Sequence, residues 1–274
     1  MATPDVRVAE GSVPEALDEA AVAGLRFQAA PGRYLLRADG VARYLVTGGE
    51  RVVIDREPRA TDPAIWTVLL GSPLAALIHQ RGGVPLVAAA VEDDERTATL
   101  IAGAAGPSPS ALAAALARRG RRTLTTRVAV LAAGDDGAVV MPGEARSLLT
   151  DAECRRLDLE PAAFPRPVRG LPRRAVPLDP RRDLAPRLVR RLVLLEVAER
   201  PGGAHVELVD AGLALGPLLR SVYRPELSLG PAPAIQFRTL VSALAGSRTA
   251  LVRQPMNDAS PGKLADRLLK GGHA

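Results

Sequence analysis

Ala98-Thr-Leu-Ile-Ala-Gly103-Ala-Ala-Gly-Pro-Ser108-Pro-Ser-Ala-Leu112 is the stretch of sequence on which the fold depends. An apolar run of strand length leads into Gly103, and a helical pattern follows Ser108. A glycine-containing loop between a strand and a helix is the outline of a phosphate-binding loop, which has the form G-x-x-x-x-G-K-[ST]. Gly103 and Ser110 fit this form, whereas Ser108 replaces its second glycine and Pro109 replaces its lysine.

These replacements remove the chemistry of the loop. Backbone N–H groups and a lysine hold the phosphates in a working loop, and Pro107 and Pro109 have no N–H. Ser108 and Pro109 are nevertheless good residues for a helix N-cap and first turn. The sequence therefore predicts a helix start that binds triphosphate poorly, with vestigial nucleotide-binding positions at Gly103, Gly106, Ser108 and Ser110.

The segments around this loop predict an α/β fold. A strand at 98–102, a helix at 111–119 and a strand at 124–131 form a βαβ unit, which implies a parallel pair of strands. Farther along, the pattern predicts a strand from Arg191 that pairs with 204–209 across Pro201-Gly-Gly. The remaining predicted elements are helices at 211–223, 235–245 and 261–269 and a strand at 249–254.

The segments before the loop predict a separate layer. Residues 1–30 read as an N-terminal extension with one short helix from Val13, because Pro14 follows a Ser12 cap. Residues 31–82 predict a small antiparallel β meander followed by helices over 62–80. Residues 83–274 then form a degenerate phosphate-loop domain with a mixed sheet flanked by helices. Its insert at 161–190 is rich in arginine and proline and is expected to be a loop.

Composition excludes several classes of protein. The 274 residues contain no apolar run of membrane-spanning length, and the first residues lack the layout of a secretory signal, so we expect a cytoplasmic protein. Cys154 is the only cysteine and reads as an inert thiol. The three histidines, His79, His205 and His273, have no metal-binding spacing, so no metal site is expected.

Positive charge is concentrated in one segment. Residues 165–191 contain nine arginines against two aspartates, while the whole chain has a net charge of +6. Arginine pairs well with carboxylates, so the segment is a candidate for binding a peptide or protein partner, and a mobile basic loop without a specific partner is the alternative. The candidate partner-binding residues are Arg166, Arg169, Arg173, Arg174, Arg181 and Arg182. Nucleic-acid binding is not expected, because no aromatic residues interleave the arginines, and membrane binding is not expected either.

The order of segments resembles the HPr kinase/phosphorylase family of serine kinases, in particular its shortened relatives beside peptide natural-product genes. The resemblance covers roughly residues 30 to 270. The residues that carry it are Gly40 to Tyr44, Leu70-Gly71-Ser72, His79 to Gly82, Val84-Pro85-Leu86, Ala90-Val91, Ala102-Gly103 to Leu116, Val128 to Leu131, Leu192 to Glu196 and Tyr223-Arg224.

The chain departs from this family where phosphate chemistry takes place. Such relatives usually have Leu-His-Ala-Ser-Ala-Val where Leu86 to Val91 stand, and Asp-Asp-Val where Thr126-Arg127-Val128 stand. The resemblance thus implies that Val87 replaces a histidine, Pro109 a lysine, and Thr126 and Arg127 an acidic pair. Losing these groups together removes most of what lowers the barrier to phosphoryl transfer.

Two functions follow from the resemblance. The first is a catalytically silent kinase homologue, without cofactor, that binds a precursor peptide or a modifying enzyme in peptide natural-product biosynthesis and self-associates. The alternative is an ATP-dependent serine kinase that uses ATP and Mg²⁺ at an atypical site.

Two roles are possible for each of three features: Arg127, Ser110 and the acidic run. Arg127 either attracts an anion or is a strand end facing solvent, and Ser110 could also cap the helix. The acidic run from Glu92 to Glu95 either replaces lost metal ligands or forms a turn of solvated charges, which is the favoured interpretation.

Overall fold

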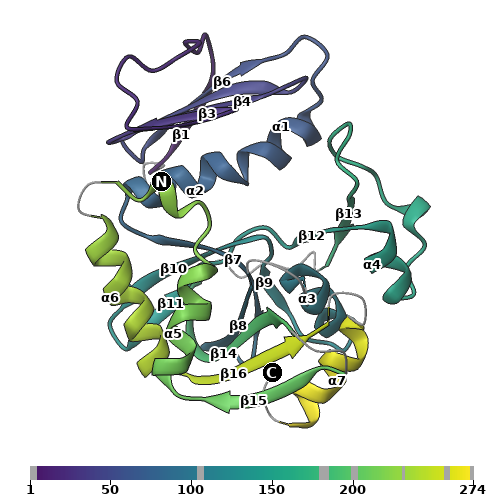
Figure 1. Ribbon diagram of the computed structural model, residues 1–274. Helices are drawn as coiled ribbons and strands as arrows, with labels where there is room; N and C mark the ends of the chain where they lie inside the picture. The colour runs from purple at the N-terminus through teal and green to yellow at the C-terminus, as the bar shows by residue number, and fades with distance from the viewer. Residues whose placement is uncertain are drawn as a thin grey trace. The chain divides into compact units, whose positions relative to one another are not determined.

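The computed structural model describes residues 5–103, 108–178, 185–198, 203–229, 232–255 and 260–271. The chain divides into two compact units (Figure 1). Unit 1 consists of Met1–Gly83, Pro167–Leu171 and Arg224–Gln236, and unit 2 of Val84–Arg166, Pro172–Tyr223 and Phe237–Ala274.

Unit 1 is built on a six-stranded sheet with the strand order β1-β6-β5-β4-β3-β2. Its strands are β1 (Arg7–Glu10), β2 (Val22–Gly24), β3 (Phe27–Ala30), β4 (Arg33–Ala38), β5 (Ala42–Thr47) and β6 (Arg51–Arg56). The predicted antiparallel meander is present as β4, β5 and β6. Helices α1 (Asp62–Leu69) and α2 (Ser72–Gln80) follow, and the 3-10 turn η2 (Pro225–Leu227) also belongs to this unit.

Successive side chains along a strand point to opposite faces of the sheet, and in unit 1 both faces have apolar side chains. Tyr44 and Ile54 pack with Ile65 and Leu77 of the helices, and the Tyr44 hydroxyl donates to the Ile65 carbonyl at 3.0 Å. Burial raises the pKa of Tyr44 above its ordinary value. Side chains one position along the strands, such as Leu35, point to the opposite face, where they form a second apolar cluster.

The helix predicted from Val13 is wrong. Residues 11–21, all of them described, contain no helix. Val13 and Leu17 instead cover the second face of the sheet, and their backbone N–H groups donate to the side chains of Asp55 and Gln28. Burial of these side chains and the hydrogen bonds to the sheet outweigh the local capping signal, which contributes only about 1 kcal/mol.

Unit 2 is built on an eight-stranded mixed sheet with the order β11-β10-β7-β8-β14-β16-β15, and β9 also pairs with β7. Its strands are β7 (Val84–Glu92), β8 (Thr97–Ala102), β9 (Thr123–Thr125), β10 (Val128–Gly134), β11 (Gly137–Val140), β14 (Arg187–Val197), β15 (His205–Val209) and β16 (Arg248–Gln254). The pair β12 (Arg146–Leu149) and β13 (Arg174–Pro177) forms a separate two-stranded sheet. The α/β fold class expected from the sequence is therefore present.

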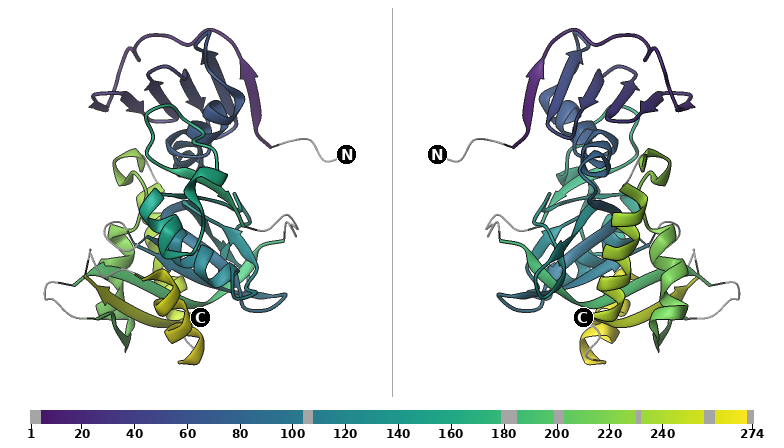
Figure 2. Two further views of the ribbon diagram at one scale, coloured as in Figure 1. Left: turned by 90° about the vertical axis from the view of Figure 1, so that its right-hand side faces the viewer. Right: turned by 90° about the vertical axis from the view of Figure 1, so that its left-hand side faces the viewer.

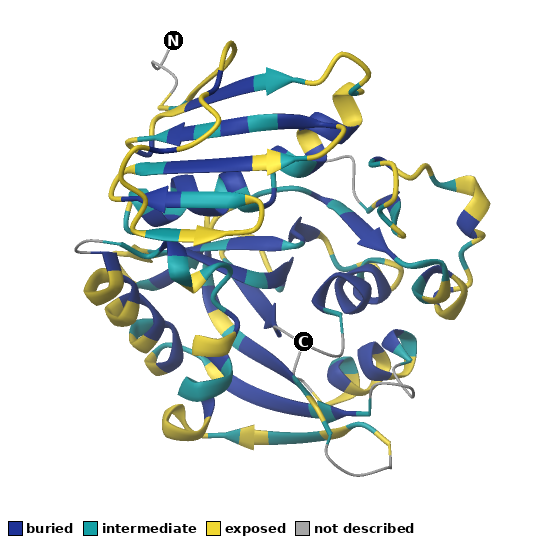
Figure 3. Cartoon of the chain, turned by 45° about the horizontal axis from the view of Figure 1, so that its top comes forward, coloured by how far each residue is buried: buried dark blue, intermediate teal, exposed yellow. Residues whose placement is uncertain are grey.

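Helices cover both faces of the large sheet (Figures 1 and 2). The helices of unit 2 are α3 (Pro109–Ala117), α4 (Asp151–Arg156), α5 (Ala211–Arg220), α6 (Ala232–Ala245) and α7 (Pro261–Lys270), with the 3-10 turn η1 (Pro161–Ala163). The first residues of α6 are assigned to unit 1. One face packs against α5 and α6, and the other packs against α3 and α7. The central strands β7, β8 and β14 are mostly buried, as Figure 3 shows.

The structure differs from the prediction in two strand pairings and in one segment that was expected to be a loop. β8 and β10 run in the same direction but do not pair, because β7 lies between them and is antiparallel to both; the parallel neighbour of β8 is β14. β15 pairs with β16 rather than β14, because β16 pairs with β14 along its whole length. The segment 161–190 is not only loop, since it contains β13 and the first residues of β14.

Candidate functional site

The phosphate-loop outline starts at Gly103, where β8 ends. The Gly103 N–H donates to the Val87 carbonyl of β7 at 3.0 Å. A Cβ atom at Gly103 would lie 2.9 Å from the Cβ atom and 3.0 Å from the carbonyl oxygen of Leu195 on β14. Close packing of strands thus requires a glycine here, whether or not a nucleotide binds. Gly106 and Pro107 lie outside the described residues.

Helix α3 is capped by its own sequence. The Ser108 hydroxyl accepts a hydrogen bond from the Ala111 N–H at 3.2 Å, and Pro109 occupies the first turn without an N–H to offer. Two of the first three helical positions therefore present no free donor to a phosphate. Ser110 does not cap the helix: it lies within the first turn, and its carbonyl accepts from the Ser147 hydroxyl at 3.0 Å.

Val87, Gly103 and Arg127 come from three different segments of the large sheet. Val87 is half-buried on β7, its N–H donates to the Ser221 carbonyl, and it stands opposite Val128 in the β7–β10 ladder. The next residue, Ala88, donates its N–H to the Arg127 carbonyl at 3.3 Å. The structure thus places Val87, Gly103 and Arg127 beside one another, where β8 ends and β10 begins.

Thr126 is a buried structural residue at this point. Its backbone N–H donates to the Glu144 carbonyl at 2.8 Å. Its hydroxyl lies 3.1 Å from the Glu144 carbonyl and 2.9 Å from the Arg146 carbonyl. These contacts fasten the segment 144–146 to the junction of β9 and β10.

Arg127 has an unfavourable backbone conformation. Its φ is 67°, and the Val128 N–H donates to the Thr126 carbonyl at 2.8 Å. This combination is the rare positive-φ form of the γ-turn, and strain of this kind costs on the order of 1–3 kcal/mol and clusters at functional sites. The Arg127 guanidinium binds Glu144 at 3.1 Å and is 19% exposed, so the interpretation of Arg127 as a solvent-facing strand end is wrong.

Glu144 and Arg146 complete a cluster that the sequence did not reveal. The Arg146 Nε atom donates to one carboxylate oxygen of Glu144 at 2.7 Å, while Arg127 donates to the other oxygen. No fixed spacing links residue 127 to residues 144 and 146. The one available signal is a pair of charged residues beside the Pro142-Gly143 turn, which is a weak signal for a site.

The acidic run is not a turn of solvated charges throughout. Glu92 is buried against Arg187 at 2.8 Å, and Asp93 lies 3.4 Å from Arg191. Asp94 accepts from the backbone N–H groups of Arg96 and Thr97, and these hydrogen bonds lower its pKa. Two arginines of the basic segment thus neutralise acids at the opposite end of the sheet from Gly103.

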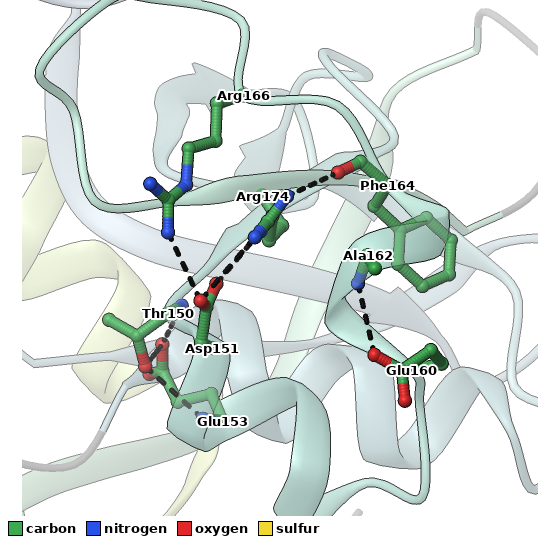
Figure 4. Close-up of polar contacts among 8 residues, drawn as sticks. All are labelled: Thr150, Asp151, Glu153, Glu160, Ala162, Phe164, Arg166 and Arg174. Atoms are coloured by element: carbon green, nitrogen blue, oxygen red, sulfur yellow. Dashed lines mark hydrogen bonds and ion pairs between the residues drawn. The ribbon is translucent and has the colours of Figure 1, made fainter.

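Further described arginines of the basic segment make contacts within the chain, and Figure 4 shows two of them. Arg166 and Arg174 converge on Asp151, and Arg174 also donates to the Phe164 carbonyl. The hydrogen bond from Arg174 lowers the pKa of Asp151 below its usual range. Arg173 donates to the Leu148 carbonyl at 3.0 Å.

The side chains of these arginines differ in their exposure to solvent. The side chain of Arg174 is 18% exposed, whereas those of Arg166 and Arg173 are 51% and 41% exposed. Arg169 is exposed as well, and Arg181 and Arg182 lie outside the described residues. Arg174 is therefore a structural residue, and Arg166 and Arg173 remain accessible to a partner.

Other candidate groups contribute little chemistry. Cys154 is buried in the core of unit 2, and burial raises the pKa of its thiol. Among the residues that the structure describes, no three His, Cys, Asp or Glu side chains are grouped as a metal site requires. Within the described ranges, no helix has the length and apolar character needed to cross a membrane.

The chain is similar to the HPr(Ser) kinase/phosphatase from Coxiella burnetii, with 13% sequence identity, a TM-score of 0.31, and coverage of 69% of this chain and 95% of that chain. Neither the identity nor the TM-score identifies a family or an activity for this chain. No protein-family model matches the sequence, and no curated protein matches it.

Proposed function

We propose that this chain is a catalytically silent HPr-kinase-like protein that binds a peptide or protein partner. The observation that carries the proposal is which residues occupy the start of α3 and the neighbouring start of β10. Ser108 and Pro109 occupy the N-terminus of α3. By the resemblance of the sequence, Arg127 stands where such kinases have a carboxylate for Mg²⁺. A guanidinium at a metal position repels a divalent cation, and a self-capped helix offers few donors to a triphosphate.

An acidic side chain at this junction is already paired. Glu144 accepts hydrogen bonds from two guanidiniums, Arg127 and Arg146. A carboxylate held in this way is a poor base for a serine hydroxyl and a poor metal ligand, because both roles require its lone pairs. The pairing of Glu144 therefore supports the proposal of catalytic silence, as do the replaced residues.

The partner in this proposal is an acidic peptide segment, which would be a precursor peptide or part of a modifying enzyme in peptide natural-product biosynthesis. The exposed arginines Arg166 and Arg173 support this partner, because guanidinium groups form paired hydrogen bonds with carboxylates. The biosynthetic setting rests on the family resemblance of the sequence.

Calorimetry with Mg-ATP tests the loss of catalysis. We expect no heat of binding at millimolar nucleotide and no phosphate transfer to a serine-containing peptide. Micromolar affinity together with phosphate incorporation would show an active kinase with an atypical nucleotide site and would overturn the proposal.

Fluorescence anisotropy tests the partner. The probe is a fluorescein-labelled glutamate-rich peptide, with a lysine-rich version as the reference. Arg166→Glu with Arg173→Glu should weaken binding of the acidic peptide, while Arg174 is left in place because Asp151 depends on it. The control is Arg118→Glu with Arg238→Glu, which changes the charge equally at exposed positions directly after α3 and on α6. Equal affinities for the two double variants would remove Arg166 and Arg173 from the proposal.

A further inference from the structure

We infer that the open edge of β1 is a docking site at which an extended peptide adds a strand to the sheet of unit 1. The peptide that fits this edge has acidic side chains on one face and apolar side chains on the other. The inference rests on the proposed peptide-binding function and deepens it, because it assigns a backbone conformation and a side-chain pattern to the partner.

β1 is the last strand at one end of the sheet of unit 1. It pairs with β6 on one side and with no other described strand, and Figure 2 shows it at the outer edge of this sheet. All the residues of the strand, Arg7–Glu10, are exposed. The strand contains no proline, and its register with β6 has no bulge, so β1 lacks these two obstacles to pairing with a further strand.

The backbone of β1 turns hydrogen-bonding groups toward the open side. The Arg7 N–H donates to the Glu50 carbonyl, directly before β6, at 2.7 Å. The N–H of Gly11, directly after β1, also donates to a carbonyl of β6, at 3.0 Å. In a parallel ladder, successive residues turn their N–H and C=O groups to alternate sides of the strand. The N–H and C=O groups of Val8 and Glu10 therefore point away from β6, where an added strand would bind them.

Arginines form a row across one face of the sheet at this edge. Arg7 of β1 stands directly opposite Arg51 of β6. In the same row, Arg51 stands opposite Thr47 of β5, and Thr47 stands opposite Arg33 of β4. Residues paired in this way have their side chains on the same face, and neighbouring strands lie about 4.8 Å apart. The row therefore places three arginines on one face, two of them on adjacent strands.

The two adjacent arginines favour an acidic partner. Like charges that stand directly opposite each other destabilise a strand pair. Arg7 and Arg51 are both exposed, and neither side chain forms an ion pair with a described residue. By contrast, Glu10, at the other end of β1, pairs with Arg56 at 3.3 Å. A carboxylate opposite Arg7 on an added strand would relieve the repulsion between the two guanidiniums.

The other face of β1 continues an apolar row. Val8 is 44% exposed and stands opposite Val52 of β6, which stands opposite Val46 of β5. Val52 and Val46 belong to the buried cluster between the sheet and helices α1 and α2. A valine-like residue opposite Val8 would extend this row and bury apolar surface that is now exposed. The peptide pattern that fits β1 therefore alternates acidic and apolar residues.

Fluorescence anisotropy with the full chain and a labelled octapeptide of alternating glutamate and valine tests the docking site. One reference peptide alternates lysine and valine. The other has the composition of the probe, with all glutamates placed before all valines. We expect the alternating acidic peptide to bind about tenfold more tightly than either reference, because it alone presents carboxylates to Arg7 and apolar side chains to Val8 when extended. Equal affinity for the two acidic peptides would overturn the inference.

Two variants separate the backbone contact from the charge. Val8→Pro removes an N–H that points away from β6, so it should keep the β1–β6 ladder and weaken peptide binding by about tenfold. Val8→Ala keeps this N–H and is the matched control, with a smaller loss. Arg7→Gln should weaken binding by about tenfold, the equivalent of one charge-assisted hydrogen bond. Arg59→Gln, at an exposed position of unit 1, is the charge-matched control and should bind like the wild type.

Amide hydrogen exchange followed by NMR spectroscopy reports strand addition directly. Binding of the alternating acidic peptide should slow the exchange of the Val8 and Glu10 N–H groups, because each would donate to a carbonyl of the added strand. Unchanged exchange at both residues would overturn the inference, as would wild-type affinity of a folded Val8→Pro variant. If Val8→Pro does not fold, the exchange measurement on the wild type decides.

The outcomes for this docking site and for the proposed function differ. Wild-type affinity of Arg7→Gln, together with loss of peptide binding in Arg166→Glu with Arg173→Glu, would overturn the β1 site and leave the proposed function standing. Mg-ATP binding with phosphate transfer would overturn the proposed function, whereas slowed exchange of the β1 amides would still support the docking site.

Discussion

The Arg187 guanidinium donates a hydrogen bond to the Glu92 carboxylate at 2.8 Å and so joins the first residue of β14 to the last residue of β7. Both side chains are buried, at 2% and 7% exposure. Arg122, on the loop before β9, also pairs with Glu92, at 3.2 Å. A buried pair of this kind makes each member depend on the other, because an unpaired charge in the interior is costly.

Removing one member of this pair should destabilise the chain strongly. Glu92→Ala removes a carboxylate that is buried against Arg187, so we expect a loss of about 3–5 kcal/mol in the free energy of unfolding. Urea denaturation measures it, with Glu95→Ala at an exposed position of the same turn as the control. Replacing both Glu92 and Arg187 by methionine should recover most of the loss, and a double variant as unstable as Glu92→Ala would contradict this account.

The N-cap of α3 should contribute measurably to the free energy of unfolding. Ser108→Ala removes the acceptor for the Ala111 N–H, and N-cap replacements of this kind cost about 1 kcal/mol. Ser110→Ala is the matched control, since the described contacts of Ser110 use its backbone carbonyl. Chemical denaturation of the two variants compares them directly. A larger loss for Ser110→Ala than for Ser108→Ala would show that the cap is assigned to the wrong serine.

Gly103 should resist substitution for steric reasons. Gly103→Ala places a Cβ atom 2.9 Å from the Cβ atom of Leu195, and overpacking of a closely packed core costs about 1–3 kcal/mol. Thermal unfolding is the measurement. Gly203→Ala is the control, because no described atom lies within 4 Å of a Cβ atom there. If both variants unfold at the wild-type temperature, strand packing does not explain the glycine.

Asp151 should make stability depend on pH in the acid range. The hydrogen bond from Arg174 lowers the pKa of Asp151 in the folded chain below its unfolded value, which is about 3.9. Its contribution is therefore complete above the unfolded pKa and is lost as the pH falls through the folded pKa.

Urea midpoints measured from neutral pH down into the acid range test this dependence. The wild type should lose more stability on acidification than Asp151→Asn, which has no titrating group at this position. Asp136→Asn, at an exposed turn between β10 and β11, should follow the wild-type curve. Parallel curves for the wild type and Asp151→Asn would contradict the role of the Arg174 hydrogen bond.

Local patterns predicted most of the elements but not all of their pairings. The meander of β4 to β6, the break between α1 and α2, and the helices α5, α6 and α7 follow from apolar periodicity and from Gly and Pro signals, which act within a few residues. The insertion of β7 between β8 and β10 does not follow from these signals, because hydrogen bonds between distant strands decide it. The failed helix at Val13 has the same origin, since the sheet face that it covers lies elsewhere in the chain.

The sequence alone predicts the Ser108-Pro109 helix start and the proline where a phosphate-binding loop has its lysine, because capping and the absence of an N–H are local chemistry. Only the tertiary structure decided which acidic residue each of these arginines pairs with. Arg127 meets Glu144, Arg187 meets Glu92, and Arg174 meets Asp151 across long or irregular separations in the chain. Electrostatic pairing depends on distance and burial in space, and no spacing along the chain encodes either quantity.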